Sequence, residues 1–426
     1  MAQERSETKT VVILGTLDTK GQETMFLRAL IEQQGLKTIV INMGTYESAF
    51  PADITNEEVA KAGGVDLEDI RAGGLPRDKI TEVVIEGAIK HVAQLLARGK
   101  LDGVVSLGGA SATAMATSVM KMLPFGVPKL MVSSVAAMPQ YAAGYFATAD
   151  IVMFSSVTDI AGLNILIRDV LTRAAGAICG LVKASGGSII PMLRERAKRQ
   201  PLVAVTGFHY SEKCTQYVLE HLEKLGYEVI RVHAQGIADR AMEEMVRQGI
   251  FGGVVDIVPA GVSEELLGGN RTAGPGRLEA AGEKGIPQVV IPCGFEMISC
   301  GPIERKDKND PLWVSKNLAS RKLYIHDAFR VQARTLPAEL RLIAKVVADK
   351  LNEAKGPVRF LVPLRGWSSL SVAGEPLYDP EGDNVFIGEL KKHLKAKIIE
   401  IDAPLVSPEF GEGVVKTFDK LMKESR

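Results

Sequence analysis

The stretch that decides the fold is residues 11–41, VVILGTLDTKGQETMFLRALIEQQGLKTIVI. Its first residues, Val11–Leu14, are apolar and predict a buried strand that ends at Gly15. Residues 22–34 then repeat apolar side chains at helical spacing, and Gly35 marks the end of that helix. Residues 38–41 predict a second strand. A strand, a helix and a strand in this order indicate a parallel sheet with a right-handed crossover.

The same pattern begins again after Pro201. There Gly207 and Gly236 match Gly15 and Gly44 at one common offset, and later segments correspond in the same order. A stretch rich in glycine, serine and basic residues separates the two patterns. We therefore expect an α/β protein with two Rossmann-like domains whose sheets are mainly parallel and which are related by an internal duplication. The expected parts are residues 1–184, a linker at 185–200, and residues 201–426.

The composition excludes several classes of protein. The 426 residues hold 51 Lys and Arg against 51 Asp and Glu, and this neutrality disfavours a nucleic-acid binder or a polybasic membrane-surface protein. No apolar run of about 18 residues predicts a membrane span, and the polar residues 1–10 predict no secretory signal. Four cysteines in a chain of this length are no disulfide framework. We expect a cytoplasmic protein.

Two loops of the first domain predict an anion site, because ligands of open α/β sheets bind beyond the carboxyl ends of the strands. Residues 15–21, GTLDTKG, offer two hydroxyls, a lysine and the N–H groups of a helix start. Residues 108–113, GGASAT, offer small residues and two hydroxyls. Each loop alone also fits a tight turn, and neither is a Walker A or GxGxxG motif. Together they predict a phosphate or nucleotide site with Gly15, Thr16, Asp18, Thr19, Lys20, Gly108, Gly109, Ser111, Thr113 and Ser133 as binding residues.

The second domain places polar side chains at or after its predicted strand ends. Histidine beside carboxylates can act as a general base or bind a metal, and arginine can hold a carboxylate or phosphate. We expect His233 or His326 to move a proton, and Asp256 or Glu264 to orient it or to hold a divalent ion. Arg277 and Arg365 are expected to anchor a small acidic substrate. The alternative is that each of these groups has a purely structural role.

Longer motifs resemble a known family. Five segments look like the motifs of the tomato mosaic virus resistance protein-like ATP-binding family. They are residues 15–21, 126–133 (GVPKLMVS), 159–164 (DIAGLN), 363–366 (PLRG) and 378–380 (YDP). The resemblance covers essentially the whole chain. It implies ATP binding in the first domain and a homodimer, and we expect Mg²⁺ as an accompanying cofactor. Further segments that resemble the family contain His233 and Arg277, and residues 363–366 contain Arg365.

One departure from the family concerns the second loop. The family usually has GGSGGT there, whereas this chain has Ala110 and Ala112. The methyl groups would hinder a positive φ or a close approach of phosphate, so nucleotide binding could be weakened or another ligand selected. We expect an enzyme that binds ATP and acts on a small acidic metabolite at a second-domain or interdomain cleft. The alternative is a nucleotide-gated protein-interaction module without turnover.

Overall fold

The structure, a computed structural model, describes residues 8–185, 190–197 and 199–425. The chain separates into two compact units, Met1–Pro191 and Met192–Arg426. This boundary falls inside the expected linker, of which residues 186–189 and Lys198 lie outside the described residues. The helix α8, Ile190–Ala197, also lies in this linker. Among the described residues, no helix is both long and apolar enough to cross a membrane.

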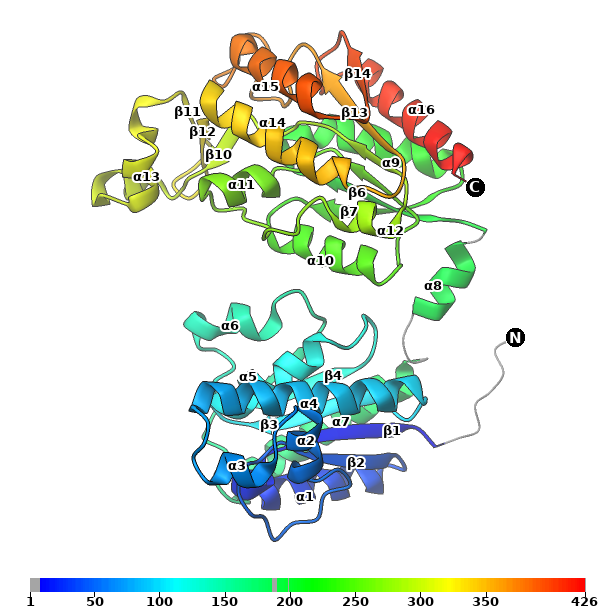
Figure 1. Cartoon of the computed structure of the whole chain (residues 1–426), viewed down its shortest axis with the longest axis vertical. Helices are drawn as coiled ribbons and strands as arrows, with labels where there is room; N and C mark the ends of the chain where they lie inside the picture. Colours follow the sequence, from blue (N-terminus) through cyan, green and yellow to red (C-terminus); the bar gives the residue numbers. More distant parts are fainter. Residues whose placement is uncertain (1–7, 186–189, 198, 426) are drawn as a thin grey trace. The chain divides into compact units, whose positions relative to one another are not determined.

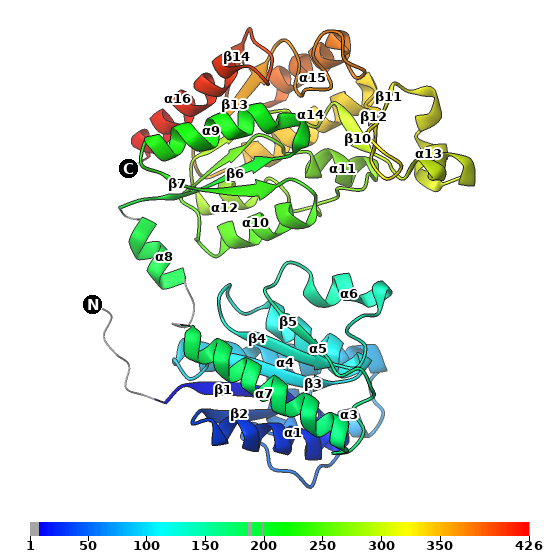
Figure 2. The same ribbon diagram turned by 180° about the vertical axis from the view of Figure 1, so that it is seen from behind.

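The first domain alternates strands and helices (Figure 1). Its elements are β1 (Thr10–Gly15), α1 (Leu17–Gln33), β2 (Lys37–Asn42), α2 (Asn56–Ala62), α3 (Leu67–Arg71), α4 (Arg77–Ala97), β3 (Gly103–Gly108), α5 (Ala110–Lys121), β4 (Lys129–Ser133), α6 (Pro139–Phe146), β5 (Val152–Ser155) and α7 (Ile165–Ala184). The five strands form one parallel sheet in the order β2-β1-β3-β4-β5. Helices α1 and α7 cover one face of it, and α4 and α5 cover the other (Figures 1 and 2).

The second domain repeats this plan and adds to it. Its elements are β6 (Leu202–Gly207), α9 (Glu212–Lys224), β7 (Glu228–His233), α10 (Ile237–Arg247), β8 (Gly253–Asp256), α11 (Gly261–Leu267), α12 (Ala280–Lys284), β9 (Gln288–Val290), β10 (Met297–Ser299), α13 (Pro311–Ser315), β11 (Leu323–Ile325), β12 (Val331–Arg334), α14 (Pro337–Asn352), β13 (Val358–Pro363), α15 (Pro380–His393), β14 (Lys397–Ile401) and α16 (Pro408–Glu424). Six strands form a parallel sheet in the order β14-β13-β9-β8-β6-β7. The other three form a small antiparallel sheet, β10-β12-β11.

The two domains share their strand order and a close contact between the first strand and the helix that follows it. Counted within each parallel sheet, the first five strands lie in the order 2-1-3-4-5, the order of flavodoxin-like doubly wound sheets. Each first strand ends in a glycine beside a threonine of the next helix. A Cβ at Gly15 would lie 3.0 Å from Thr24 Cγ2, and a Cβ at Gly207 would lie 2.5 Å from Thr215 Cγ2. The predicted fold class, two Rossmann-like α/β domains with mainly parallel sheets, is confirmed.

Candidate functional site

The first sheet has its topological switch point between β1 and β3. From β1 the chain moves to β2 on one side, and β3, β4 and β5 follow on the other side. The loops that follow β1 and β3 therefore diverge over opposite faces, and ligands of such sheets bind in the crevice that opens between them. These two loops are the segments 15–21 and 108–113. The sequence prediction thus places its binding residues where the topology favours a ligand.

The loop after β3 presents the free start of a helix. Gly109 is the N-cap of α5 and has no side chain to cap it. The N–H of Thr113 makes the first bond of the helix, 2.9 Å from the carbonyl oxygen of Gly109. The N–H groups of the three preceding residues, Ala110–Ala112, have no helical partner, and Ala110 and Ser111 are exposed. The dipole and the free N–H groups make this end of α5 attractive to an anion.

The two alanines of this loop carry no backbone strain. Ala110 and Ala112 lie in α5, and neither is among the described non-glycine residues with positive φ. A Cβ at Gly108 would come within 2.4 Å of Ala112 Cβ, so the methyl of Ala112 packs onto this glycine. The departure from the family pattern therefore changes the surface of the loop and leaves its backbone conformation intact.

The loop after β1 is held by its own polar groups. The Lys20 ammonium donates to the Ile160 carbonyl, beyond the end of β5. Asp18 Oδ2 accepts from the N–H groups of Thr45, at 2.9 Å, and Tyr46, at 3.1 Å. Asp18 thus fixes the loop after β2 and does not cap α1. The Thr19 hydroxyl donates a hydrogen bond to the Thr16 hydroxyl at 3.1 Å, and Thr19 is exposed. This loop and the start of α5 both follow the carboxyl ends of neighbouring parallel strands.

Two predicted binding residues have structural roles. Thr113 and Ser133 are fully buried, and their hydroxyl oxygens lie 2.8 Å apart. Ser133 Oγ also accepts from the N–H of Val135, at 3.1 Å. This pair ties α5 to the end of β4. We assign Thr113 and Ser133 to the support of the loop, which leaves Ser111 as the exposed hydroxyl beside the free N–H groups.

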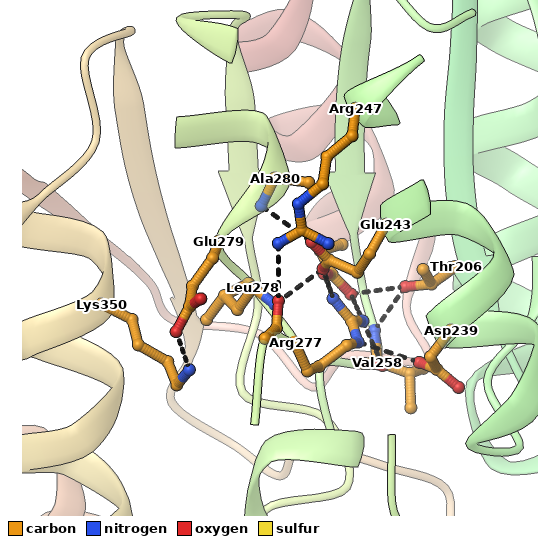
Figure 3. A network of polar contacts seen from close by, with 12 residues as sticks. Thr206, Asp239, Glu243, Arg247, Val258, Arg277, Leu278, Glu279, Ala280 and Lys350 are labelled. Atoms are coloured by element: carbon orange, nitrogen blue, oxygen red, sulfur yellow. Dashed lines mark hydrogen bonds and ion pairs between the residues drawn. The ribbon is translucent and has the colours of Figure 1, made fainter. Parts of the chain in front are cut away.

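Arg277, predicted to anchor a substrate, lies in the interior of the second domain (Figure 3). Its five N–H groups donate to Asp239 (3.1 Å), Glu243 (3.1 Å), both oxygens of Asp256 (2.6 and 2.7 Å) and the carbonyl of Val258 (3.4 Å). Burial alone would lower the pKa of Arg277, but the three carboxylates outweigh it and raise the pKa. With no N–H left for an anion, we assign Arg277 and Asp256 a structural role in place of the predicted one.

Glu264, predicted to orient a proton or a metal, is also enclosed. Its Oε1 accepts from Arg271 Nε, at 2.9 Å, and from Arg271 Nη2, at 2.6 Å. The N–H of Ser299 donates to the same oxygen at 3.0 Å. Burial raises the pKa of Glu264, and the charge of Arg271 opposes that rise. Glu264 holds α11 against β10, so we assign it a structural role as well.

The histidines remain accessible, and the structure brings together a pair that we did not predict. His209, in the short 3-10 helix His209–Ser211 after β6, has its ring centroid 5.5 Å from that of His326, with the planes at 78°. The Tyr324 hydroxyl lies 3.3 Å from His326 Nδ1. His209 is exposed and follows the strand that borders the second switch point, between β6 and β8. Its place directly after an apolar strand put it among the polar residues at strand ends, although it was not chosen as a catalytic residue.

His233 shares a charged neighbour, Glu212, with His209, whereas Arg365 forms a separate ion pair. His233 ends β7 and is exposed. The hydrogen bond from Arg231 is the main cause that lowers the pKa of Glu212, and the charges of His209 and His233 add to this effect. Arg365 forms an exposed pair with Asp402 through two hydrogen bonds of 2.7 Å. The predicted residues therefore belong to separate networks, not to one constellation.

A further buried cluster surrounds Arg334 of β12. Arg334 Nη2 donates to Asp383 Oδ1 at 2.5 Å, and Glu296 and Asp379 lie beside them. Burial raises the pKa of Asp383 to about 7 against the opposing charge of Arg334. Burial also raises the pKa of Glu296, which is fully enclosed. No sequence pattern singled out Asp383, because one aspartate near a helix start is usual for a cap.

The remaining candidate chemistry concerns metal ligands and cysteine thiols. In the part of the chain that the structure describes, no three His, Cys, Asp or Glu side chains group closely enough to hold a metal ion. The four cysteines are buried, and burial raises the pKa of Cys214 and Cys300 to about 12. Burial also raises the pKa of Cys293, so this residue stays a protonated thiol at neutral pH.

Comparison with solved structures gives only weak global similarity. A putative UDP-N-acetylglucosamine 2-epimerase from Listeria monocytogenes is 13% identical, with a TM-score of 0.24, over 67% of this chain and 79% of that one. A UDP-GlcNAc 2-epimerase from Methanocaldococcus jannaschii is 11% identical, with a TM-score of 0.22, over 97% and 93%. Scores this low carry no functional argument.

Sequence relatives cover the whole chain. A UPF0261 protein of Clostridium tetani is 37% identical over 98% of this chain and 100% of its own length. The ToMV resistance protein Tm-1(GCR237) of Solanum lycopersicum is 28% identical over 100% of this chain and 57% of its own length. Residues 9–186 match the N-terminal domain, and residues 200–422 the C-terminal domain, of the uncharacterised protein family UPF0261. The chain belongs to the UPF0261 family.

Proposed function

We propose that the first domain binds a nucleotide at the switch point between β1 and β3. The observation that carries the proposal is the placement of both predicted loops at this one point of the sheet, together with the free N–H groups at the start of α5. An uncapped helix start at a switch point is a favourable place for a phosphate group. Resemblance to the ATP-binding family suggests ATP as the nucleotide.

The residues present fit a phosphate chain. The N–H groups of Ala110–Ala112 and the hydroxyl of Ser111 would donate to phosphate oxygens from the α5 side. Thr16 and Thr19 would donate from the opposite loop, and Lys20 would add a positive charge on leaving the Ile160 carbonyl. Mg²⁺ would be held mainly by the phosphates themselves, with Asp18 as the one carboxylate in the two loops.

A charge placed at the start of α5 tests the proposal. Ser111→Glu puts a carboxylate at the positive end of the helix, which should preserve or slightly raise stability. The same carboxylate should repel phosphate and weaken ATP binding about tenfold or more. Ala114→Glu is the matched control, because Ala114 is exposed on the same helix one turn further along. Calorimetry that finds equal ATP affinity for both variants, or no binding by the unaltered protein, would overturn the proposal.

A second candidate is proton transfer on a small acidic metabolite in the second domain. It rests on the contact between His209 and His326 and on the Tyr324 hydroxyl beside His326. An imidazole at the edge of a sheet can act as a general base toward a bound substrate. Titration with succinate, followed by NMR of the imidazole protons, tests this candidate. A shift no larger at His209 and His326 than at His91 of the first domain would exclude it.

The resemblance also suggests two proposals about assembly. A homodimer would sediment at twice the 45.8 kDa of the chain, and a species of 45.8 kDa at micromolar concentration would contradict it. The non-catalytic alternative, in which the nucleotide gates a protein interaction, predicts ATP binding without hydrolysis. Release of inorganic phosphate above the rate of the Ser111→Glu variant would exclude that alternative.

A further inference from the structure

A small cavity lies inside the second domain, beside the Arg277 network. It measures about 10 Å³ and is bounded by residues of α10, β8, α12 and β9 and by Leu278. Three of its lining residues are polar, namely Glu243, Asp256 and Gln288, and the other five are apolar. A volume of this size is about that needed for the centre of one water molecule.

Gln288 supplies an unpaired donor at this cavity. The residue is 2% exposed, and its backbone N–H donates to the Pro357 carbonyl at 3.0 Å. Its side-chain Nε2 has no hydrogen-bond partner among the described residues. A buried amide without a partner loses its hydration with nothing in return, so such groups are rare in folded proteins. The Nε2 group of Gln288 therefore needs a hydrogen-bond acceptor, and the surrounding described side chains do not provide one.

The two carboxylates have acceptor capacity left. Among the described residues, Glu243 Oε2 accepts only from the N–H of Ala280, at 2.8 Å, while Oε1 accepts from Arg277 and Leu278 (Figure 3). Within the same part of the chain, Asp256 Oδ2 accepts only from Arg277 Nη1, at 2.6 Å. A carboxylate oxygen can accept two hydrogen bonds. Each residue can thus take one more donor from the side of the cavity.

We propose that this cavity binds one structural water molecule. The water accepts a hydrogen bond from Gln288 Nε2 and donates to Glu243 and Asp256, which gives it the two to four polar partners that buried waters have. A cation fits less well, because the Gln288 N–H groups point their positive ends at the occupant. The bridge connects α10, β8 and β9 and completes the polar network that fixes the end of β8.

A crystal structure of the full chain at about 1.5 Å resolution tests the site directly. The expected result is one fully occupied water peak within 3.2 Å of Gln288 Nε2 and of at least one of the two carboxylates. An empty cavity, or a Gln288 side chain paired with a protein acceptor, would overturn the proposal. An anomalous peak in the cavity after a rubidium soak would also overturn it, because the occupant would then be a cation.

Two variants test it in solution by the sign of their effect. Gln288→Met keeps the length of the side chain but removes the donor, and Ala281→Val fills the space of the water. If a water is bound, each variant lowers the ratio of folded to unfolded protein, by roughly fivefold to tenfold. If the cavity is dry, each variant raises that ratio, since an unpaired amide is removed or a void is filled. Stabilisation by both variants would refute the bound water.

Discussion

The buried carboxyl group of Asp383 makes the stability of the second domain depend on pH. Its side chain pairs with Arg334, yet burial raises its pKa from 3.8 to about 7, and the neighbouring Glu296 and Asp379 add to that rise. The folded state therefore binds more protons than the unfolded state between these two values. The contribution of Asp383 is fully present below pH 3.8 and is lost as the pH rises through 7.

The magnitude follows from the two pKa values. One unit of pKa difference corresponds to about 1.4 kcal/mol, so ionised Asp383 costs about 4 kcal/mol relative to its protonated form. Between pH 6 and pH 8 the free energy of unfolding should fall by about 1.4 kcal/mol through this group alone. Asp383→Asn removes the titrating group and keeps an oxygen that can accept from Arg334, so this part of the pH dependence should vanish.

Tryptophan fluorescence measures the second domain separately, because the only two tryptophans, Trp313 and Trp367, lie in it. Trp367 also packs against Phe386 of α15, the helix that carries Asp383, with ring centroids 5.1 Å apart. Urea unfolding at pH 6 and pH 8 should show a loss of stability that is about 1.4 kcal/mol smaller in Asp383→Asn than in the unaltered protein.

Glu381→Gln is the matched control for this experiment. Glu381 lies on the same helix and is exposed, so its charge is solvated in both the folded and the unfolded state. This variant should keep the pH dependence of the unaltered protein. The reasoning is refuted if the unaltered domain is equally or more stable at pH 8, or if Asp383→Asn retains the full loss.

Three further predictions concern other parts of the molecule. Arg277→Met should destabilise the second domain by about 3–5 kcal/mol in urea unfolding, because it leaves buried carboxylates unpaired. Arg365→Met, which breaks an exposed pair, should leave the urea midpoint unchanged. Equal effects of the two variants would contradict these assignments. Lys20→Ala should weaken ATP binding in calorimetry by about tenfold, with the exposed Lys37→Ala as the neutral control. The four buried cysteines should react with a thiol reagent only after unfolding in urea, and labelling of the native chain at pH 8 would contradict their burial.

The sequence could predict the parallel sheets because their signals are local. Short apolar runs such as Val11–Leu14 and the glycines that follow helices mark strands and turns without reference to the rest of the chain. Gly35 and Gly226 both have positive φ, at 82° and 89°, as the end of a helix requires. The antiparallel sheet was harder to foresee, since β10 holds only three residues and no alternation can show over that length.

The candidate sites were predictable where position alone matters and unpredictable where burial decides. The loops after β1 and β3 follow apolar strands, so their place at the edge of the sheet could be inferred. Asp256 ends a strand and Arg277 lies in a loop too, but the acids Asp239 and Glu243 that pair with Arg277 lie on α10, more than thirty residues before it. One signal was available, because these two acids share a helical face with apolar Met242 and Val246, and all four are buried.

The central claim is that the first domain holds a nucleotide between the loops that follow β1 and β3. A crystal structure of the full chain grown with ATP and Mg²⁺ tests this claim most directly. The account predicts phosphate density within hydrogen-bond distance of the N–H groups of Ala110–Ala112, with the Lys20 ammonium turned toward it. ATP bound at another place, or no ATP at millimolar concentration, would contradict it.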